Sequence, residues 1–250
     1  MTQQNGLSPI FNAAAAAAAE HKSFVNFDLH LSPDELRDFE TLNVSETSSY
    51  DNFGHLGTLR DETARFLQSL GNTPELSACA AETIDRVVKD SLLAVKADTA
   101  WFTLRAFLPT HAFDIPRWHT DGRFYTETET DQKKIATTLK GPSTLLNDLP
   151  DGLRSAFHEK LRSSYDDTPE ERHAINTLID PKNTQRAGHG QATIFIVGSE
   201  DRAAVHSEPA ISTERIFLSI LPGSHAQIKE LRQTWEAPPT SYTKAPAPKP

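Results

Sequence analysis

The alternation of apolar and polar residues predicts a β-sheet in the second half of the chain, because successive side chains of a strand point to opposite faces. Residues 100–108 show this pattern over nine positions, and the Phe, Leu and Ala side chains at every second position would share one face. Strands are predicted at residues 23–29, 100–108, 134–140, 192–197, 203–206 and 215–221. The chain is therefore expected to be α+β but mainly β.

A helical spacing of apolar residues predicts helices that pack beside this sheet. Residues 33–42 follow the capping box Ser32-Pro33-Asp34-Glu35, and two amphipathic helices follow at residues 59–70 and 73–96. Their apolar stripes need a surface to cover, and the outer face of a β-barrel sheet is the expected one. Further helices are predicted at residues 152–165, 168–179 and 225–235.

These elements indicate one domain over residues 23–235, with helical support at about 58–97 and a helical insertion at about 151–179. The insertion is expected to form either a wall over a site or a surface decoration. Residues 43–57 are rich in turn-forming residues and are expected to be a loop. Seven consecutive alanines favour a flexible arm or a marginal helix at residues 1–22, and the proline-rich residues 236–250 favour a disordered tail.

Composition narrows the classes of function. The 250 residues include 34 acidic and 25 basic side chains, a net charge of −9 with no concentrated basic run, so no nucleic-acid partner is expected. The single cysteine, Cys79, cannot form an internal disulfide and is predicted to be a core residue of its helix. No apolar run approaches the ~18 residues of a membrane span. A cytoplasmic protein that acts on small molecules is the expectation.

The candidate chemistry lies in a short motif and a distant histidine. His119 and Asp121 are separated by one residue, so in an extended segment both side chains project to the same face, and His206 lies 87 positions later at the mouth of a predicted strand. Two histidines and one carboxylate form a facial triad that leaves coordination positions open on a metal ion. Taken singly, these residues also have a purely structural explanation: His119 and Asp121 as a hydrogen-bonded surface pair, and His206 as a turn residue.

The order of these residues resembles that of the Fe(II)/2-oxoglutarate-dependent dioxygenase superfamily. His119, Asp121 and His206 match its iron ligands, and Arg215, nine residues after His206, matches its 2-oxoglutarate-binding arginine. Residues 140–144, Lys-Gly-Pro-Ser-Thr, are also similar to a turn found in some members. The resemblance covers about residues 100–221. It implies a double-stranded β-helix core (jelly-roll, cupin-like) with flanking helices, which binds Fe(II), 2-oxoglutarate and dioxygen and hydroxylates or otherwise oxidises a small organic substrate.

The resemblance also marks secondary candidates. Many members have a serine two residues after the arginine, whereas this chain has Phe217, so Phe217→Ser is expected to strengthen 2-oxoglutarate binding. Ser219 shares the strand face of Arg215 and is a candidate substitute; Arg105 lies either inside the barrel near the metal or on an outer edge. Candidate substrate contacts are Trp118, Arg123 and Tyr125. The alternative function is a non-catalytic metal-binding jelly-roll protein.

Overall fold

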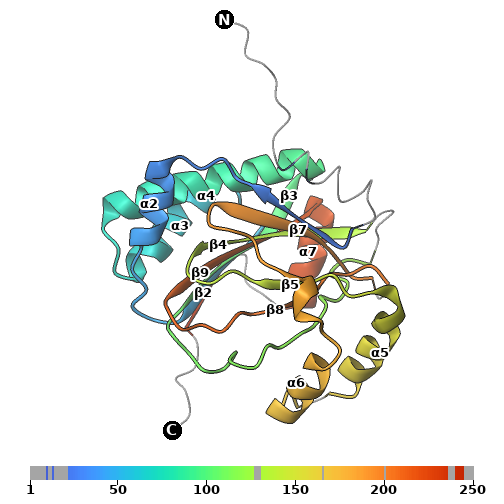
Figure 1. The fold of residues 1–250 in the computed structure, drawn as a ribbon. Coiled ribbons are helices and arrows are strands. Elements are labelled where there is room, and N and C mark those ends of the chain that lie inside the picture. Colours follow the sequence, from blue (N-terminus) through green and yellow to red (C-terminus); the bar gives the residue numbers. More distant parts are fainter. Residues whose placement is uncertain are drawn as a thin grey trace, which may run out of the picture.

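Two antiparallel β-sheets organise the computed structural model, which describes residues 10, 13, 22–126, 131–164, 166–199, 201–235 and, for the backbone, 240–244. The larger sheet has seven strands and the smaller one has three (Figure 1). Leu146 of the smaller sheet packs with Ala136 and Phe195 of the larger one, so the two sheets face each other across a shared apolar layer.

The larger sheet contains, in spatial order, β1 (Phe24–Asp28), β7 (Gln191–Val197), β4 (Gln132–Lys140), β9 (Arg215–Gly223), β3 (Thr99–Phe107), β2 (Ser48–Phe53) and β10 (Thr240–Lys244). The smaller sheet contains β6 (Thr184–Gln185), β5 (Leu145–Asn147) and β8 (Val205–Ser207). An isolated bridge between His119 and His206 adds the segment around residue 119 beside β8.

The strand order confirms the predicted double-stranded β-helix. From β3 onward the chain passes through eight extended segments, of which the second is the one around residue 119. The larger sheet holds the first, eighth, third and sixth of these segments side by side, which are β3, β9, β4 and β7. The smaller sheet holds the second, seventh, fourth and fifth, which are the segment around residue 119, β8, β5 and β6. The chain thus crosses repeatedly between the two sheets, which is the topology of a jelly roll. Strands β1, β2 and β10 extend the larger sheet at its edges.

Helices cover the outer face of the larger sheet, as the amphipathic pattern predicted. α2 (Pro33–Thr41), α3 (Leu59–Ser69) and α4 (Pro74–Val95) lie together on this face (Figure 1). Their buried side chains form one core with Phe102, Leu104 and Ala106 of β3. The alternate residues of β3 therefore point to the opposite face, toward the smaller sheet.

The predicted insertion is a pair of helices, α5 (Asp151–Arg162) and α6 (Pro169–Asn176), at the far side of the smaller sheet (Figure 1). They share a separate apolar cluster with Trp118 and with Val205 of β8. A single 3₁₀ turn, η1 (Pro181–Asn183), follows them, and α7 (His225–Thr234) follows β9. Within the described residues, no helix combines the length and apolar character needed to cross a membrane.

Two sequence predictions were wrong in these regions. The predicted loop at residues 43–57 contains β2, whose buried Asn52 donates its amide hydrogens to the Tyr50 hydroxyl and the His55 carbonyl, so polar side chains are satisfied inside the sheet. Cys79 is exposed, because the buried stripe of α4 passes through Ala80 and Ile84 instead.

The two ends of the chain differ in part from expectation. Ile10 and Ala13, in the segment predicted to be a flexible arm or a marginal helix, are helical, and they are buried against the main core, which was not expected. Residues 240–244 of the predicted disordered tail pair with β2 as strand β10, because β2 otherwise leaves its backbone groups unpaired at the sheet edge. The rest of both predicted segments lies outside the described residues.

Candidate metal centre

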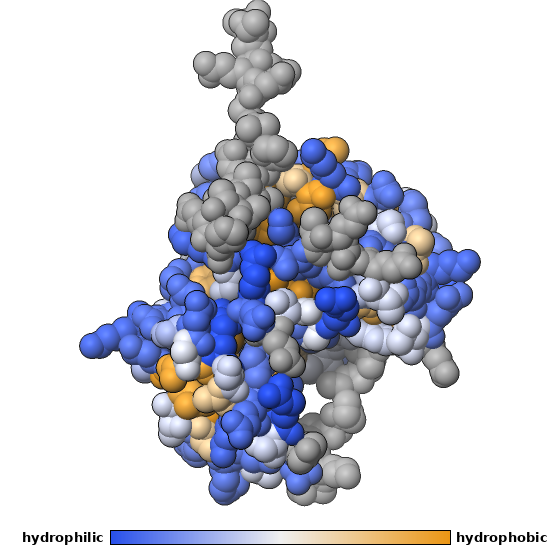
Figure 2. Space-filling model, turned by 90° about the vertical axis from the view of Figure 1, so that its right-hand side faces the viewer, coloured by the Kyte–Doolittle hydropathy of each residue, from blue (hydrophilic) through white to orange (hydrophobic). Residues whose placement is uncertain are grey.

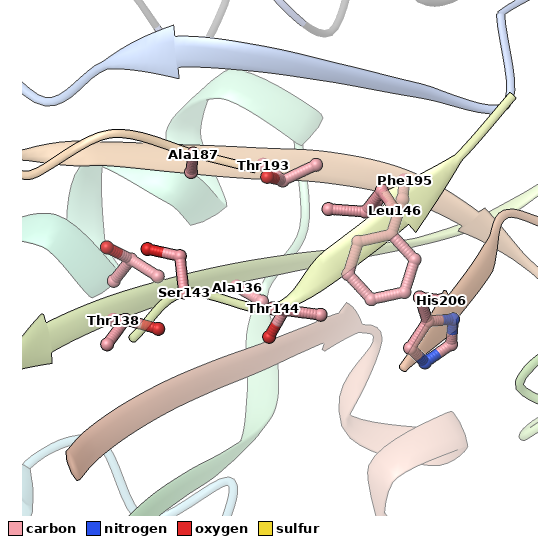
Figure 3. A pocket seen from close by; sticks show the side chains of 10 residues that line it. Ala136, Thr138, Ser143, Thr144, Leu146, Ala187, Thr193, Phe195 and His206 are labelled. Carbon is pink, nitrogen blue, oxygen red and sulfur yellow. The ribbon is translucent and has the colours of Figure 1, made fainter. Parts of the chain in front are cut away.

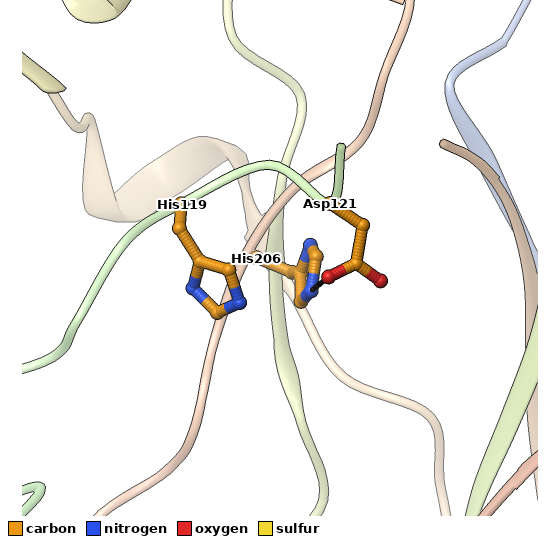
Figure 4. A group of neighbouring side chains, drawn as sticks. All are labelled: His119, Asp121 and His206. Atoms are coloured by element: carbon orange, nitrogen blue, oxygen red, sulfur yellow. Dashed lines mark ion pairs between the residues drawn. The ribbon is translucent and has the colours of Figure 1, made fainter. Parts of the chain in front are cut away.

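A reciprocal pair of backbone hydrogen bonds brings the two histidines of the predicted triad together. The N–H of His119 donates to the carbonyl of His206 at 2.9 Å, and the N–H of His206 donates to the carbonyl of His119 at 2.9 Å. Directly paired residues of antiparallel segments project to the same side, and the two imidazole rings lie 4.3 Å apart between centroids (Figure 4). Asp121, two positions after His119, projects to that side as well.

Backbone carbonyls fix the ring orientation of both histidines. Nδ1 of His119 lies 2.8 Å from the carbonyl oxygen of Arg117, and Nδ1 of His206 lies 3.0 Å from that of Ala204. A carbonyl oxygen only accepts, so each Nδ1 must carry the hydrogen. The lone pair of each neutral ring is therefore on Nε2, the arrangement in which metal-binding histidines are commonly held.

Asp121 completes the cluster from a well-anchored position. Its carbonyl accepts from the N–H of Gly198 at 3.0 Å, and its Oδ1 lies 3.7 Å from Nε2 of His206. Its Oδ2 accepts from the Lys134 ammonium at 2.9 Å. One potential ligand atom from each of His119, Asp121 and His206 lies within 4.8 Å of the others.

The protonation states of this cluster suit a cation. Burial by itself raises the pKa of Asp121, but the Lys134 ammonium and the neighbouring histidines outweigh burial and hold this pKa well below its ordinary value. Burial, together with His119, lowers the pKa of His206 to about 4, so this imidazole is neutral at pH 7. Two imidazole nitrogens and one ionised carboxylate on one side of an ion fit divalent iron and leave its other face open.

A narrow cavity leads from His206 into the space between the two sheets (Figure 3). The space free of protein atoms is about 300 Å³ and is partly open to solvent, whereas the room for the centre of a water-sized sphere is about 10 Å³. Its wall near the histidine is apolar, and its far end carries hydroxyl groups; the lining includes Ala136, Thr138, Ser143, Thr144, Leu146, Thr193, Phe195 and His206. The cavity thus connects the candidate metal centre with the turn at residues 141–144.

Arg215 is held beside this cavity by Thr144, one of the residues that line it. Its side chain is 2% exposed, its Nε donates to the carbonyl of Pro142 at 2.9 Å, and its Nη2 donates to the hydroxyl of Thr144 at 3.0 Å. The guanidinium lies over the ring of Phe217 at 4.6 Å and that of Phe107 at 5.7 Å. No carboxylate among the described residues forms an ion pair with it. Burial lowers the pKa of Arg215 to about 10, so the group remains a buried cation at pH 7.

The other two residues predicted to bind the cosubstrate lie on the same inner face of the sheet. Ser219 is buried and paired in register with Thr103 and Ala136. Arg105 is paired with Phe217, and its side chain is exposed at the end of the sheet, where its charge opposes that of Arg215. Arg105 therefore lies at the rim of the barrel rather than in its interior.

Two of the three residues predicted to contact the substrate are engaged in contacts within the protein. The indole N–H of Trp118 donates to Asn176 at 2.8 Å, and the ring is buried among the insertion helices. Tyr125 is buried, and its hydroxyl donates to the carbonyl of Pro222 at 3.0 Å. Both side chains thus already have structural partners, whereas Arg123 is exposed.

Two residues of the site were not predicted from the sequence. Lys134 lies on the inner face of β4. Alternation within residues 134–140 indicates that its side chain points inward, but this pattern does not predict a lysine as part of the site. Gly198 has φ +76°, and a Cβ there would lie 2.9 Å from Cα of Arg123. A glycine is needed where this turn approaches the segment that carries Asp121.

Comparisons with known proteins give matches among solved structures only. No family model matches the chain, and no curated protein matches it. A prolyl-4-hydroxylase of Pseudomonas putida is similar at TM-score 0.40 and 10% identity, covering 86% of this chain and 94% of that one. The dioxygenase for auxin oxidation in rice has TM-score 0.43 and 10% identity, covering 90% of each chain. A Trichoplax adhaerens prolyl hydroxylase, in complex with a hypoxia inducible factor peptide, has TM-score 0.42 and 7% identity, covering 88% and 92%. At such values nothing about the activity or substrate of this chain follows from the likeness.

Proposed function

We propose that this chain is a non-haem Fe(II)- and 2-oxoglutarate-dependent oxygenase that oxidises a small organic substrate. The observation that carries the proposal is a 2-His-1-carboxylate cluster together with a buried arginine: His206 of the cluster and Thr144, a partner of the arginine, line one cavity. His119 and His206 present Nε2 atoms, Asp121 presents a carboxylate oxygen, and Arg215 supplies an unpaired cation beyond the cavity. This is the constellation that an iron ion chelated by a dicarboxylic keto acid requires.

Each residue has a definite task in this function. The triad would hold Fe(II) through three ligands, and Fe(II) with its keto acid supplies the activation of dioxygen. Arg215 would take the distal carboxylate of 2-oxoglutarate, with the hydroxyl of Thr144 beside it. Phe195 and Leu146 line the cavity between these ends and exclude water from it, which strengthens the charge pairing at Arg215.

The alternative is a jelly-roll protein that binds a metal without oxidative chemistry. A metal-binding module needs the triad but has no use for a desolvated guanidinium. Burying a cation is costly unless an anion accompanies it, and Arg215 has only neutral partners among the described residues. This difference favours the oxygenase.

The test is anaerobic loading with Fe(II), followed by addition of 2-oxoglutarate and air. The wild type is expected to bind one equivalent of metal and to form succinate, slowly in the absence of substrate. His206→Ala is expected to lose both properties. His173→Ala, which removes an exposed histidine of α6, is the matched control and is expected to retain both. If the protein binds metal but neither binds 2-oxoglutarate nor forms succinate, the oxygenase proposal is wrong and the alternative, a metal-binding jelly-roll protein, takes its place.

A further inference from the structure

Lys134 is a charged side chain built into the barrel interior. It projects from β4 on the face that carries Phe195 of β7 in register, and its side chain is 14% exposed. Its ammonium lies 5.4 Å from the ring centre of Phe124 and 5.8 Å from that of Trp101. A lysine is rarely placed in such surroundings without a specific partner, because desolvating an ammonium costs several kcal/mol.

Its partner is one oxygen of the candidate metal ligand. Nζ of Lys134 donates to Oδ2 of Asp121 at 2.9 Å, whereas Oδ1 of the same carboxylate is the oxygen that lies 3.7 Å from Nε2 of His206. The two oxygens of Asp121 are thereby divided between two tasks. Oδ2 is held by the lysine, and Oδ1 faces the histidines.

We propose that Lys134 is a positioning residue that makes Asp121 bind the metal through one oxygen only. This inference rests on the proposed function of the triad. An octahedral ion bound by two imidazoles and one carboxylate oxygen keeps three positions open, enough for a chelating keto acid and dioxygen. A carboxylate that chelates through both oxygens fills a fourth position and leaves too few.

The aromatic side chains explain why the lysine stays in place. Trp101 and Phe124 flank the ammonium, and such rings attract a cation. Among the described residues, the hydrogen bond of this ammonium goes to Asp121. Trp101 is itself fixed, since its indole N–H donates to Asp51 at 3.0 Å. The ammonium is thus directed to Oδ2 of Asp121.

Replacement of Lys134 should move two affinities in opposite directions. Lys134→Met keeps the length and apolar stem of the side chain, removes a positive charge beside a dication, and frees Oδ2 to chelate. Mn(II) is therefore expected to bind several-fold more tightly, while 2-oxoglutarate is expected to bind the metal-loaded variant at least tenfold more weakly. A lysine that served only to stabilise the fold would weaken both affinities together when removed.

The decisive measurement counts water ligands on bound Mn(II), by electron paramagnetic resonance in ¹⁷O-enriched water without 2-oxoglutarate. Three waters are expected in the wild type and two in Lys134→Met. Lys134→Gln, a neutral donor to Oδ2, is expected to restore the third. Circular dichroism verifies that each variant folds.

Three waters in Lys134→Met would overturn the positioning role, and so would a wild type that binds no Mn(II). The outcome is separable from that of the proposed function. If wild type and variant differ as expected but no succinate forms with Fe(II), the positioning role stands and the oxygenase assignment falls.

Discussion

Arg215→Leu is the substitution that most directly tests whether this site recognises 2-oxoglutarate. Leucine fills part of the space between Phe107 and Phe217 but removes the cation. We expect the affinity for 2-oxoglutarate to fall strongly and the affinity for metal to remain, because Arg215 is held by Pro142 and Thr144 and not by the residues of the triad.

The magnitude follows from the hydrogen bonds that the guanidinium already makes. Arginine has five N–H donors, and those on Nε and Nη2 that reach Pro142 and Thr144 use two of them. The remaining donors suffice for a paired contact to a carboxylate. Removing one partner of a buried charge-assisted pair costs on the order of 2–5 kcal/mol, or roughly 30-fold to a few thousandfold in affinity. Arg215→Lys should recover only part of this loss, since an ammonium lacks the planar fork.

The assay compares two ligands by calorimetry on Mn(II)-loaded protein under argon. 2-Oxopentanoate has the chain and keto acid of 2-oxoglutarate but no distal carboxylate. Arg215→Leu should weaken 2-oxoglutarate far more than 2-oxopentanoate, so that the variant binds the two ligands almost equally. The reasoning is refuted if the variant, folded and metal-loaded, retains the wild-type preference for 2-oxoglutarate.

Three further predictions concern Phe217, Gly141 and Glu35. Phe217→Ser should weaken 2-oxoglutarate binding in the same calorimetric assay, because the ring at 4.6 Å supports and shields the Arg215 guanidinium; this packing reverses the expectation drawn from the sequence. Gly141→Ala should lower the free energy of unfolding by roughly 1–3 kcal/mol in urea titrations, because Gly141 has φ +85° and an added Cβ would clash with the carbonyl oxygen of Glu214; an unchanged midpoint would contradict this. Burial raises the pKa of Glu35, but its bonds to Ser32 and Arg86 lower it to about 2, so Glu35 stabilises the fold above pH 4.5 and loses this effect as the pH falls toward 2. Glu35→Gln should therefore cost about 1 kcal/mol at pH 7 and nothing near pH 2, as measured by urea unfolding at each pH.

The sequence by itself determined the elements whose signals are local. The capping boxes at Ser32 and Thr168 mark the beginnings of α2 and α6, since a cap needs only side chains three residues apart. Periodicity located the long helices and the main strands for the same reason. The triad and Arg215 were recognisable because their spacing and order are themselves properties of the chain.

Only the tertiary structure decided which side chains meet. β2 consists of Ser, Tyr, Asp, Asn and Phe, and it is a strand because β3 supplies its hydrogen bonds and Tyr50 satisfies Asn52. Trp118 has the same local pattern whether it lines a substrate site or packs against α6, and only the structure shows its bond to Asn176, 58 residues away. Lys134 joins the candidate metal centre through a carboxylate oxygen of Asp121, 13 residues away. Such pairings depend on how the strands cross between the two sheets, and no local pattern encodes that arrangement.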